Sequence, residues 1–332
     1  MSPTPTNFPH PTPDVGLVRE APYKLYDGLL ATCFCACLMI GLPGNCLALT
    51  HFLRSKKRNL STLLYIVATS IDIISSVIHL PVAISLFRSR QPGIMESDVF
   101  CSIWYFILLS IQLMSMYVVA LLSVSRAIVI FAPFYRVNKK VVLITIPVYF
   151  VYQAIWICLS YITSDNYYTL SAGLCQRVFS EKDRTMVNRV MNGYHVNYCI
   201  STGIPPICVF VSFVASVFKL RTGANESSIG SDGENVSNRN NRNASLAIMY
   251  FAATFLLCNS FTFVNTALFT WVYVVKDDYP GPIYSHIFMF FYSWPISEVF
   301  CTVLNAALNP LLYFWRMREF RSRVLQLLPS RE

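Results

Sequence analysis

Long stretches with no charged residue, or with a single one, alternate with short polar clusters along the chain. Seven such stretches are present, and five of them contain no Asp, Glu, Lys or Arg: 28–53, 99–125, 141–164, 190–218 and 243–275. The other two carry one acid each, Asp72 in 61–87 and Glu298 in 279–315. Every stretch reaches the roughly 20 residues that an α-helix needs to cross a bilayer. Because only helices and closed barrels satisfy their backbone hydrogen bonds in lipid, we predict seven membrane-spanning helices.

The composition agrees with a membrane protein. Hydrophobic residues make up 55% of the 332 residues and charged residues only 13%, with a mean hydropathy of +0.48. Since soluble domains contain about 25% charged residues, a soluble enzyme, a disordered chain and a disulfide-rich secreted module are excluded. We predict an all-α membrane protein with three regions. These are an N-terminal tail (1–27), a seven-transmembrane helix bundle (28–315, with a flexible loop at 221–243) and a C-terminal segment (316–332).

Positive charge is concentrated on one side of the predicted bundle. Seven crossings place the termini on opposite sides of the membrane, and the side of the C-terminus holds 17 of the 26 Lys and Arg residues. Positively charged loops stay in the cytoplasm during insertion, so the N-terminus is predicted to be extracellular and the C-terminus cytoplasmic. The net charge of +9 then reflects topology and contact with membrane lipids, and no nucleic-acid partner is expected.

Successive residues of an α-helix are rotated by 100°, so residues at suitable spacings line up on one face of the helix. Two predicted spans carry such a stripe. In the third span the stripe consists of Cys101, Leu108, Gln112, Ser115 and Arg126. In the seventh span it consists of Glu298, Asn305, Asn309 and Tyr313. Helical rise places Cys101 near the outer surface and Arg126 near the inner one. Polar groups are costly in hydrocarbon, so both stripes are predicted to face the interior of the bundle.

Asp72 is the most costly residue of the second span. A charged side chain inside the bilayer costs about 2.5 to 3.5 kcal/mol on insertion scales. Four polar side chains at a similar predicted depth offer oxygen ligands: Asn45, Ser115, Asn305 and Asn309. A hard cation bound among these oxygens would remove the penalty, and so would protonation of Asp72. Both alternatives are open on this basis.

Taken in order, the motifs of these spans resemble those of rhodopsin-like (class A) G-protein-coupled receptors over nearly the whole chain. The matching residues are Gly44-Asn45, Asp72, Cys101, Arg126, Trp156, Pro205-Pro206, Phe255-Leu-Leu-Cys258, Asn309-Pro310-Leu-Leu-Tyr313 and Phe320. The resemblance implies a plasma-membrane receptor that transduces an extracellular ligand into activation of a heterotrimeric G protein. It also implies that 316–328 forms the family's short amphipathic helix at the membrane surface.

The resemblance further implies roles for single residues. An allosteric sodium ion would bind in a pocket formed by Asp72, Ser115, Asn305 and Asn309, with Asn45 at the same depth. Cys101 would form a disulfide bond with Cys175 in the second outer loop, and Arg126 would contact the G protein. Asn259, Pro310 and Tyr313 occupy the positions of the family's activation switches. Apart from sodium, no cofactor is expected.

Three departures from the family pattern bear on signalling. Ser125 stands where the family has an acid beside the arginine, so Arg126 lacks the neighbour that would hold it in the resting state. The sixth span reads Cys258-Asn259-Ser260-Phe261 in place of Cys-Trp-x-Pro, and its inner end lacks acids. Our hypothesis is that the resting state is weakly held and that basal signalling is raised.

The ligand class is constrained mainly by exclusion. Leu108 occupies the position at which amine receptors of the family carry an Asp, which argues against a biogenic amine. Val303 occupies the position of the opsin Schiff-base lysine, which argues against retinal. Leu108, Gln112 and Glu298 are candidate contacts for a peptide or small polar ligand. Glu298 has a structural alternative, because Pro295 suits the first turn of a helix and an acid is favoured there by the helix dipole.

Two other classes of function compete with a coupled receptor. A ligand-binding decoy, or an arrestin-biased receptor that does not couple to G proteins, would explain the altered Ser125 and Asn259. An ion transporter would use buried acids, but no acid or His chain connects Asp72 with Glu298. An intramembrane hydrolase would need a second acid or a nucleophile with its base beside Asp72, and neither spacing occurs, so no enzyme activity is expected.

Overall fold

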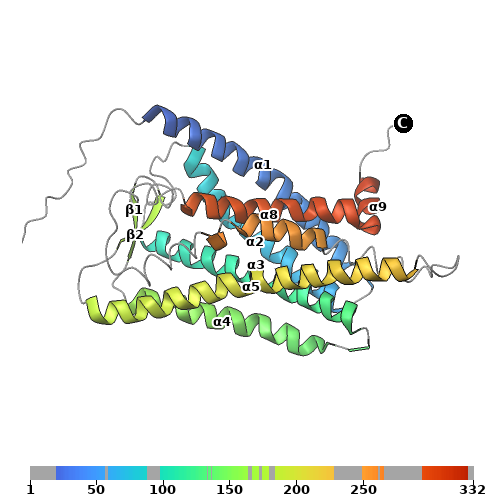
Figure 1. The fold of residues 1–332 in the computed structure, drawn as a ribbon. Coiled ribbons are helices and arrows are strands. Elements are labelled where there is room, and N and C mark those ends of the chain that lie inside the picture. The colour runs from blue at the N-terminus through green and yellow to red at the C-terminus, as the bar shows by residue number, and fades with distance from the viewer. Residues whose placement is uncertain are drawn as a thin grey trace, which may run out of the picture.

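The computed structural model describes residues 20–56, 59–87, 98–132, 134–135, 137–163, 167–171, 174–178, 184–227, 249–260, 262–264 and 294–327. Its long helices lie side by side in one bundle, as Figure 1 shows. They are α1 (Glu20–Leu53), α2 (Leu60–Phe87), α3 (Asp98–Phe131), α4 (Lys139–Thr163), α5 (Arg184–Ser227) and α8 (Trp294–Arg316). A shorter apolar helix spans Met249–Ser260, and α9 (Arg318–Leu327) follows α8.

Within the described residues, five helices are long and apolar enough to cross a membrane. The crossing segments are Ala31–Leu53, Leu60–Leu80, Phe106–Phe131, Lys139–Leu159 and Val196–Lys219. They coincide with the first five predicted spans. Met249–Ser260 and α8 lie where the sixth and seventh spans are predicted. The all-α bundle predicted from the charge-free stretches is therefore confirmed.

One element was not predicted. Between α4 and α5, β1 (Tyr167–Ser171) and β2 (Leu174–Val178) form an antiparallel hairpin whose register pairs Tyr167 with Val178 and Ser171 with Leu174. Both strands contact α3. The hairpin lies at one end of the bundle and α9 at the other (Figure 1), which we call the hairpin end and the α9 end. A five-residue strand is too short to stand out from a loop in the hydropathy pattern.

The distribution of polarity differs from that in a soluble protein, because many large apolar side chains are exposed although the core is also apolar. Large apolar side chains face outward, among them Met39 and Leu257, each 75% exposed. Polar side chains such as Asn45 and Gln153 are fully buried, at 0% exposed. This arrangement is expected where hydrocarbon surrounds the bundle and polar groups must find partners inside it.

Small residues allow α1 and α8 to approach closely. A Cβ atom added to Gly44 would lie 2.6 Å from the Cβ of Pro310, and one added to Gly41 would lie 3.1 Å from the Cα of Ala307. Contact through such residues is how transmembrane helices pack without a hydrophobic driving force. The Gly44-Asn45 and Asn309-Pro310 pairs therefore belong to a single interface.

Several boundaries differ from those predicted. α1 begins at Glu20, within the region assigned to the N-terminal tail, and α5 continues to Ser227, within the region assigned to the 221–243 loop.

α2 begins after Asn59, whose side-chain oxygen accepts a hydrogen bond from the Thr62 backbone N–H at 2.8 Å, as an N-cap residue does. α9 starts two residues after Arg316, with Phe320 buried and Arg321 and Arg323 exposed, as an amphipathic surface helix requires.

Candidate functional site

The centre of the candidate site is a buried pair of polar side chains. Asp72 on α2 is only 3% exposed, and Asn309 on α8 is 2% exposed. The Asn309 Nδ2 atom donates a hydrogen bond to the Asp72 Oδ2 atom at 2.7 Å. The bond ties α2 to α8 inside the bundle, so two of the predicted pocket residues are brought into direct contact.

Asn45 connects α1 to the same region of α8. Its Nδ2 atom donates a hydrogen bond to the backbone oxygen of Ala306 at 2.8 Å. Its Oδ1 atom is buried and has no hydrogen-bond partner among the described residues. A buried acceptor without a partner is costly. Asn45 therefore presents an oxygen that a cation could use, close to the α1–α8 contact made by Gly44 and Pro310.

The remaining predicted pocket residues lie on α8 itself and on α3, which contacts α2. Asn305 is buried on α8, one turn before Asn309, and Ser115 is half-buried on α3. The described contacts show no bond from either residue to Asp72. Within the described residues, no group of three or more His, Cys, Asp or Glu side chains could hold a metal ion. Asp72 would supply one carboxylate to the predicted pocket, and the other predicted members would supply only neutral oxygens. Such a donor set suits a hard cation better than zinc.

Arg126, near the α9 end of α3, has no close acid on its own helix. The Ser125 Oγ atom donates a hydrogen bond to the Leu122 backbone oxygen at 2.9 Å, so this hydroxyl is engaged within α3. The Nε atom of Arg126 is buried and has no hydrogen-bond partner among the described residues. The arrangement matches the departure seen in the sequence, where Ser125 replaces an acid.

The altered residue of the sixth predicted span is also turned toward its own helix. Asn259 is 6% exposed, and its Nδ2 atom donates a hydrogen bond to the Phe255 backbone oxygen at 2.9 Å. Phe255 itself is buried in the core. The side-chain amide of Asn259 is therefore hydrogen-bonded within its own helix. The family has a tryptophan, with its large ring, at this position.

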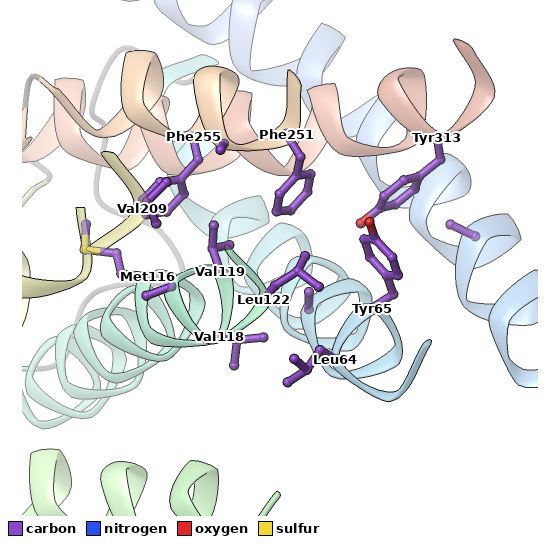
Figure 2. Close-up of a cluster of buried hydrophobic side chains, with 14 of the residues drawn as sticks. Leu64, Tyr65, Met116, Val118, Val119, Leu122, Val209, Phe251, Phe255 and Tyr313 are labelled. Atoms are coloured by element: carbon purple, nitrogen blue, oxygen red, sulfur yellow. The ribbon is translucent and has the colours of Figure 1, made fainter. Parts of the chain in front are cut away.

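Tyr313 joins a cluster of aromatic rings toward the α9 end that the sequence pattern does not predict. Figure 2 shows Tyr65 and Tyr313 pointing toward one another, with Phe251 beside them; their ring centroids are 5.6 Å apart for Tyr65–Tyr313 and 6.2 Å for Phe251–Tyr313. Phe52 stacks on Tyr65 at 5.1 Å, and Phe320 of α9 contacts Tyr313 at 6.3 Å. The cluster therefore connects five helices. No periodicity within a single span indicates such a meeting.

A polar network between α4 and α5 was missed as well. Gln153 is fully buried, and its Nε2 atom donates a hydrogen bond to the Ser201 Oγ atom at 2.6 Å. Its Oε1 atom accepts one from Asn197 at 3.3 Å, and the Asn197 Oδ1 atom accepts one from the Tyr152 hydroxyl at 2.7 Å. The sequence does carry a signal for this network. Gln153 is an amide in an otherwise apolar span, and polar residues in hydrocarbon need partners.

Of the candidate ligand contacts, two are described. Leu108 and Gln112 on α3 are 7% and 3% exposed, so both face the interior as the stripe predicts. The side chains of Glu298, Cys101 and Cys175 lie outside the described residues. Cys175 belongs to β2, opposite Leu170, and Cys101 belongs to α3, which β2 contacts. The placement of these elements is compatible with the predicted disulfide bond, which stays a prediction.

Comparison with known proteins places the chain in a family. The model of the 7 transmembrane receptor (rhodopsin family) matches residues 44–313, most of the chain. The chain belongs to this family. It is therefore a class A G-protein-coupled receptor and a multi-pass membrane protein, as the motif resemblance implies. At the level of the family, its partners are an extracellular ligand and a G protein.

Individual relatives of the receptor are distant. Over 327 residues it is 24% identical to proteinase-activated receptor 2 of Homo sapiens, which covers 93% of this chain and 73% of the relative. The Bos taurus protein of the same name is 24% identical over 323 residues, covering 93% and 74%. A crystal structure of squid rhodopsin has a TM-score of 0.68 at 19% sequence identity, covering 92% of this chain and 86% of that one. At this identity the structural likeness shows the fold alone.

Proposed function

We propose that the receptor resides in the plasma membrane and carries a signal from a ligand at the hairpin end to a heterotrimeric G protein at the α9 end. The observation that supports this most strongly is the buried bond between Asp72 and Asn309. A polar pair inside a bundle can exchange partners, which gives the helices two packings whose populations a ligand can shift. The signal needs no covalent chemistry, so the chain acts without enzyme activity.

An allosteric sodium ion fits the residues around Asp72. Asp72, Ser115, Asn305, Asn309 and Asn45, whose Oδ1 atom has no partner among the described residues, would hold it, and it would supply a positive charge to offset the carboxylate. The Asp72 side chain keeps its hydrogen bond from Asn309 in the resting packing. Rearrangement of the α2–α8 contact then weakens cation binding, because the oxygens no longer converge.

The orientation follows from the charges of the sequence. The hairpin end and the N-terminus are extracellular, and the α9 end, with its basic residues, is cytoplasmic. In the oxidising extracellular environment, a disulfide bond between Cys101 and Cys175 would hold the hairpin to α3. Antibody access to tags at both termini of intact cells tests this orientation. Access to both tags or to neither would contradict it.

The ligand is a peptide or a small polar molecule that reaches the bundle from the hairpin end. Gln112 and Glu298 are the polar candidates for contact, with Leu108 beside them on the α3 stripe. The likeness to receptors named for activation by a proteinase supports a peptide or protein input over an amine. A screen of amidated peptides and small polar metabolites on cells expressing the receptor tests this class. A hit confined to amines would contradict it.

Arg126 is proposed to contact the G protein, and its weak restraint is proposed to raise basal signalling. The support is the Ser125 hydroxyl, which bonds within α3, and the Arg126 Nε atom, which lacks a partner in the described part of the chain. Ser125→Asp would place a carboxylate beside Arg126 and lower ligand-free second-messenger output. Absent ligand-free output from both proteins at equal surface expression would reject raised basal activity.

A decoy or arrestin-biased receptor is the second candidate, and the altered Ser125 and Asn259 favour it. With a confirmed ligand, failure to stimulate nucleotide exchange on any G-protein class would support this alternative. An ion transporter is disfavoured because the spans contain no acids other than Asp72 and Glu298. Ligand-independent ion currents that require Asp72 would reverse that judgement.

A further inference from the structure

An arginine at the end of α8 sits between two aromatic rings and reaches a neighbouring helix. The guanidinium carbon of Arg316 lies 4.0 Å from the ring centroid of Tyr250, on Met249–Ser260, and 4.2 Å from that of Trp315. The Tyr250 and Trp315 rings meet edge to face, with centroids 5.0 Å apart. None of these residues belongs to the family motifs identified in the sequence.

The three groups form a contact that crosses between helices at the α9 end. Tyr250 and Trp315 are partly exposed, at 39% and 56%, whereas the Nε atom of Arg316 is buried and lacks a hydrogen-bond partner among the described residues. A cation over an aromatic face is attracted by the ring quadrupole, and the attraction grows as the cation loses water. The rings therefore provide the main polar interaction that is visible for this guanidinium.

A second contact beside Tyr250 also joins Met249–Ser260 to α8. The next residue after Tyr250, Phe251, stacks on Tyr313 with an interplanar angle of 15°, so two consecutive residues of Met249–Ser260 contact α8. By contrast, the residue beside Arg126 on α3 is Ser125, whose hydroxyl bonds within the helix. The described contacts between Met249–Ser260 and α8 at the α9 end thus include the Arg316 guanidinium.

We propose that Tyr250, Arg316 and Trp315 form a cation–aromatic clasp that holds Met249–Ser260 against α8 in the resting packing, in place of an ionic restraint at Arg126. This inference rests on the proposed function, since a resting packing has meaning only for a protein that switches. Opening of the clasp separates the two helices at the cytoplasmic face. The clasp stabilises one of the two packings, so its loss shifts the population toward the other packing.

Hydrogen–deuterium exchange on the full chain in lipid nanodiscs tests the clasp without ligand or G protein. Tyr250→Leu removes one ring face and Arg316→Gln removes the cation, so each should raise amide exchange in 249–254 about threefold to tenfold. The double variant should exceed the larger single effect by less than twofold, because both changes remove one contact. Tyr250→Phe is the matched control and should stay within twofold of wild type, as it keeps the ring.

Two results would overturn the clasp. One is unchanged exchange in 249–254 for both Tyr250→Leu and Arg316→Gln. The other is an equal rise in α4 amides, which would mean general destabilisation. Trp315→Leu serves as a second probe if Tyr250→Leu expresses poorly, and it should loosen the same segment.

Basal nucleotide exchange on G proteins, measured on the same samples, separates the two proposals. Faster amide exchange together with higher basal nucleotide exchange supports both. Faster amide exchange with no response from any G-protein class supports the clasp and counts against coupling. Unchanged amide exchange with a normal G-protein response rejects the clasp and leaves the proposed function standing.

Discussion

Asp72 shows how a single residue can serve both stability and switching. Its carboxylate is buried in a bundle that offers hydrocarbon outside, and Asn309 supplies the one hydrogen bond that the described contacts give it. One neutral donor does not balance a buried charge. A bound cation or a proton on the carboxylate would offset the cost, so we propose Asp72 as the point at which sodium acts.

We predict that sodium stabilises the purified receptor through Asp72. A ligand that binds only the folded state at ten times its dissociation constant stabilises it by about 1.4 kcal/mol. The apparent melting temperature should therefore be about 2 to 4 °C higher in sodium chloride than in choline chloride of equal ionic strength. Asp72→Asn should abolish the difference, since the amide carries no charge. An undiminished sodium effect in this variant would remove Asp72 from the site.

At this scale, sequence reasoning located the polar residues better than their partners. The cost of a charge in lipid is enough to predict that Asp72 faces inward, and helical spacing is enough to place Asn309 on an inward stripe. Their contact depends on how α2 packs against α8, and the two residues are 237 positions apart in sequence. The same limit explains why the Arg316 contact with Tyr250 was not anticipated, because an aromatic residue in a membrane span is ordinarily taken to face lipid.

At the scale of elements, the α1–α8 interface depends on a residue without a side chain. We predict that Gly44→Ala destabilises the receptor by about 1 to 3 kcal/mol, because the new Cβ would overlap Pro310 and force the helices apart. Thermal unfolding in nanodiscs measures the effect. Gly203→Ala is the matched control, since its Cβ would lie at an ordinary 3.7 Å from Phe263. Equal stability of the two variants would contradict this account of the interface.

The α4–α5 interface depends on buried hydrogen bonds. Gln153→Leu should lower stability by about 1 to 2 kcal/mol, because Ser201 and Asn197 lose their buried partner. A double-mutant cycle with Ser201→Ala isolates the bond, for which interhelical pairs in membranes average about 0.6 kcal/mol. Strict additivity of the two changes in unfolding experiments would mean that the Gln153–Ser201 bond contributes nothing.

Element positions followed from the sequence more closely than element ends. Charge-free stretches predict where the spans lie because the bilayer imposes their length, and the five described crossing helices agree. The start of α1 at Glu20 and the end of α5 at Ser227 do not follow, since helices continue past the membrane wherever hydrogen bonding permits. The β1–β2 hairpin depends on pairing between short strands and on contact with α3, which no local pattern encodes.

At the scale of the whole molecule, the interior connects the two ends through α8. This helix meets Asp72 through Asn309, α1 through Ala306 and Pro310, the aromatic cluster through Tyr313, and Met249–Ser260 through Arg316. A shift of α8 would therefore alter all of these contacts together. Packed interfaces of this kind change between discrete arrangements, which suits a receptor whose signal travels from one face to the other.

We propose that this receptor activates a G protein through the α9 end and Arg126. The most direct measurement is nucleotide exchange on each class of G protein by the full chain in nanodiscs, comparing wild type, Ser125→Asp and Arg126→Ala with empty nanodiscs. We predict ligand-free exchange above the empty-disc rate for at least one class, lower exchange with Ser125→Asp and loss of the stimulation with Arg126→Ala. Exchange equal to that of empty nanodiscs for every class, including in the presence of a confirmed ligand, would contradict the account.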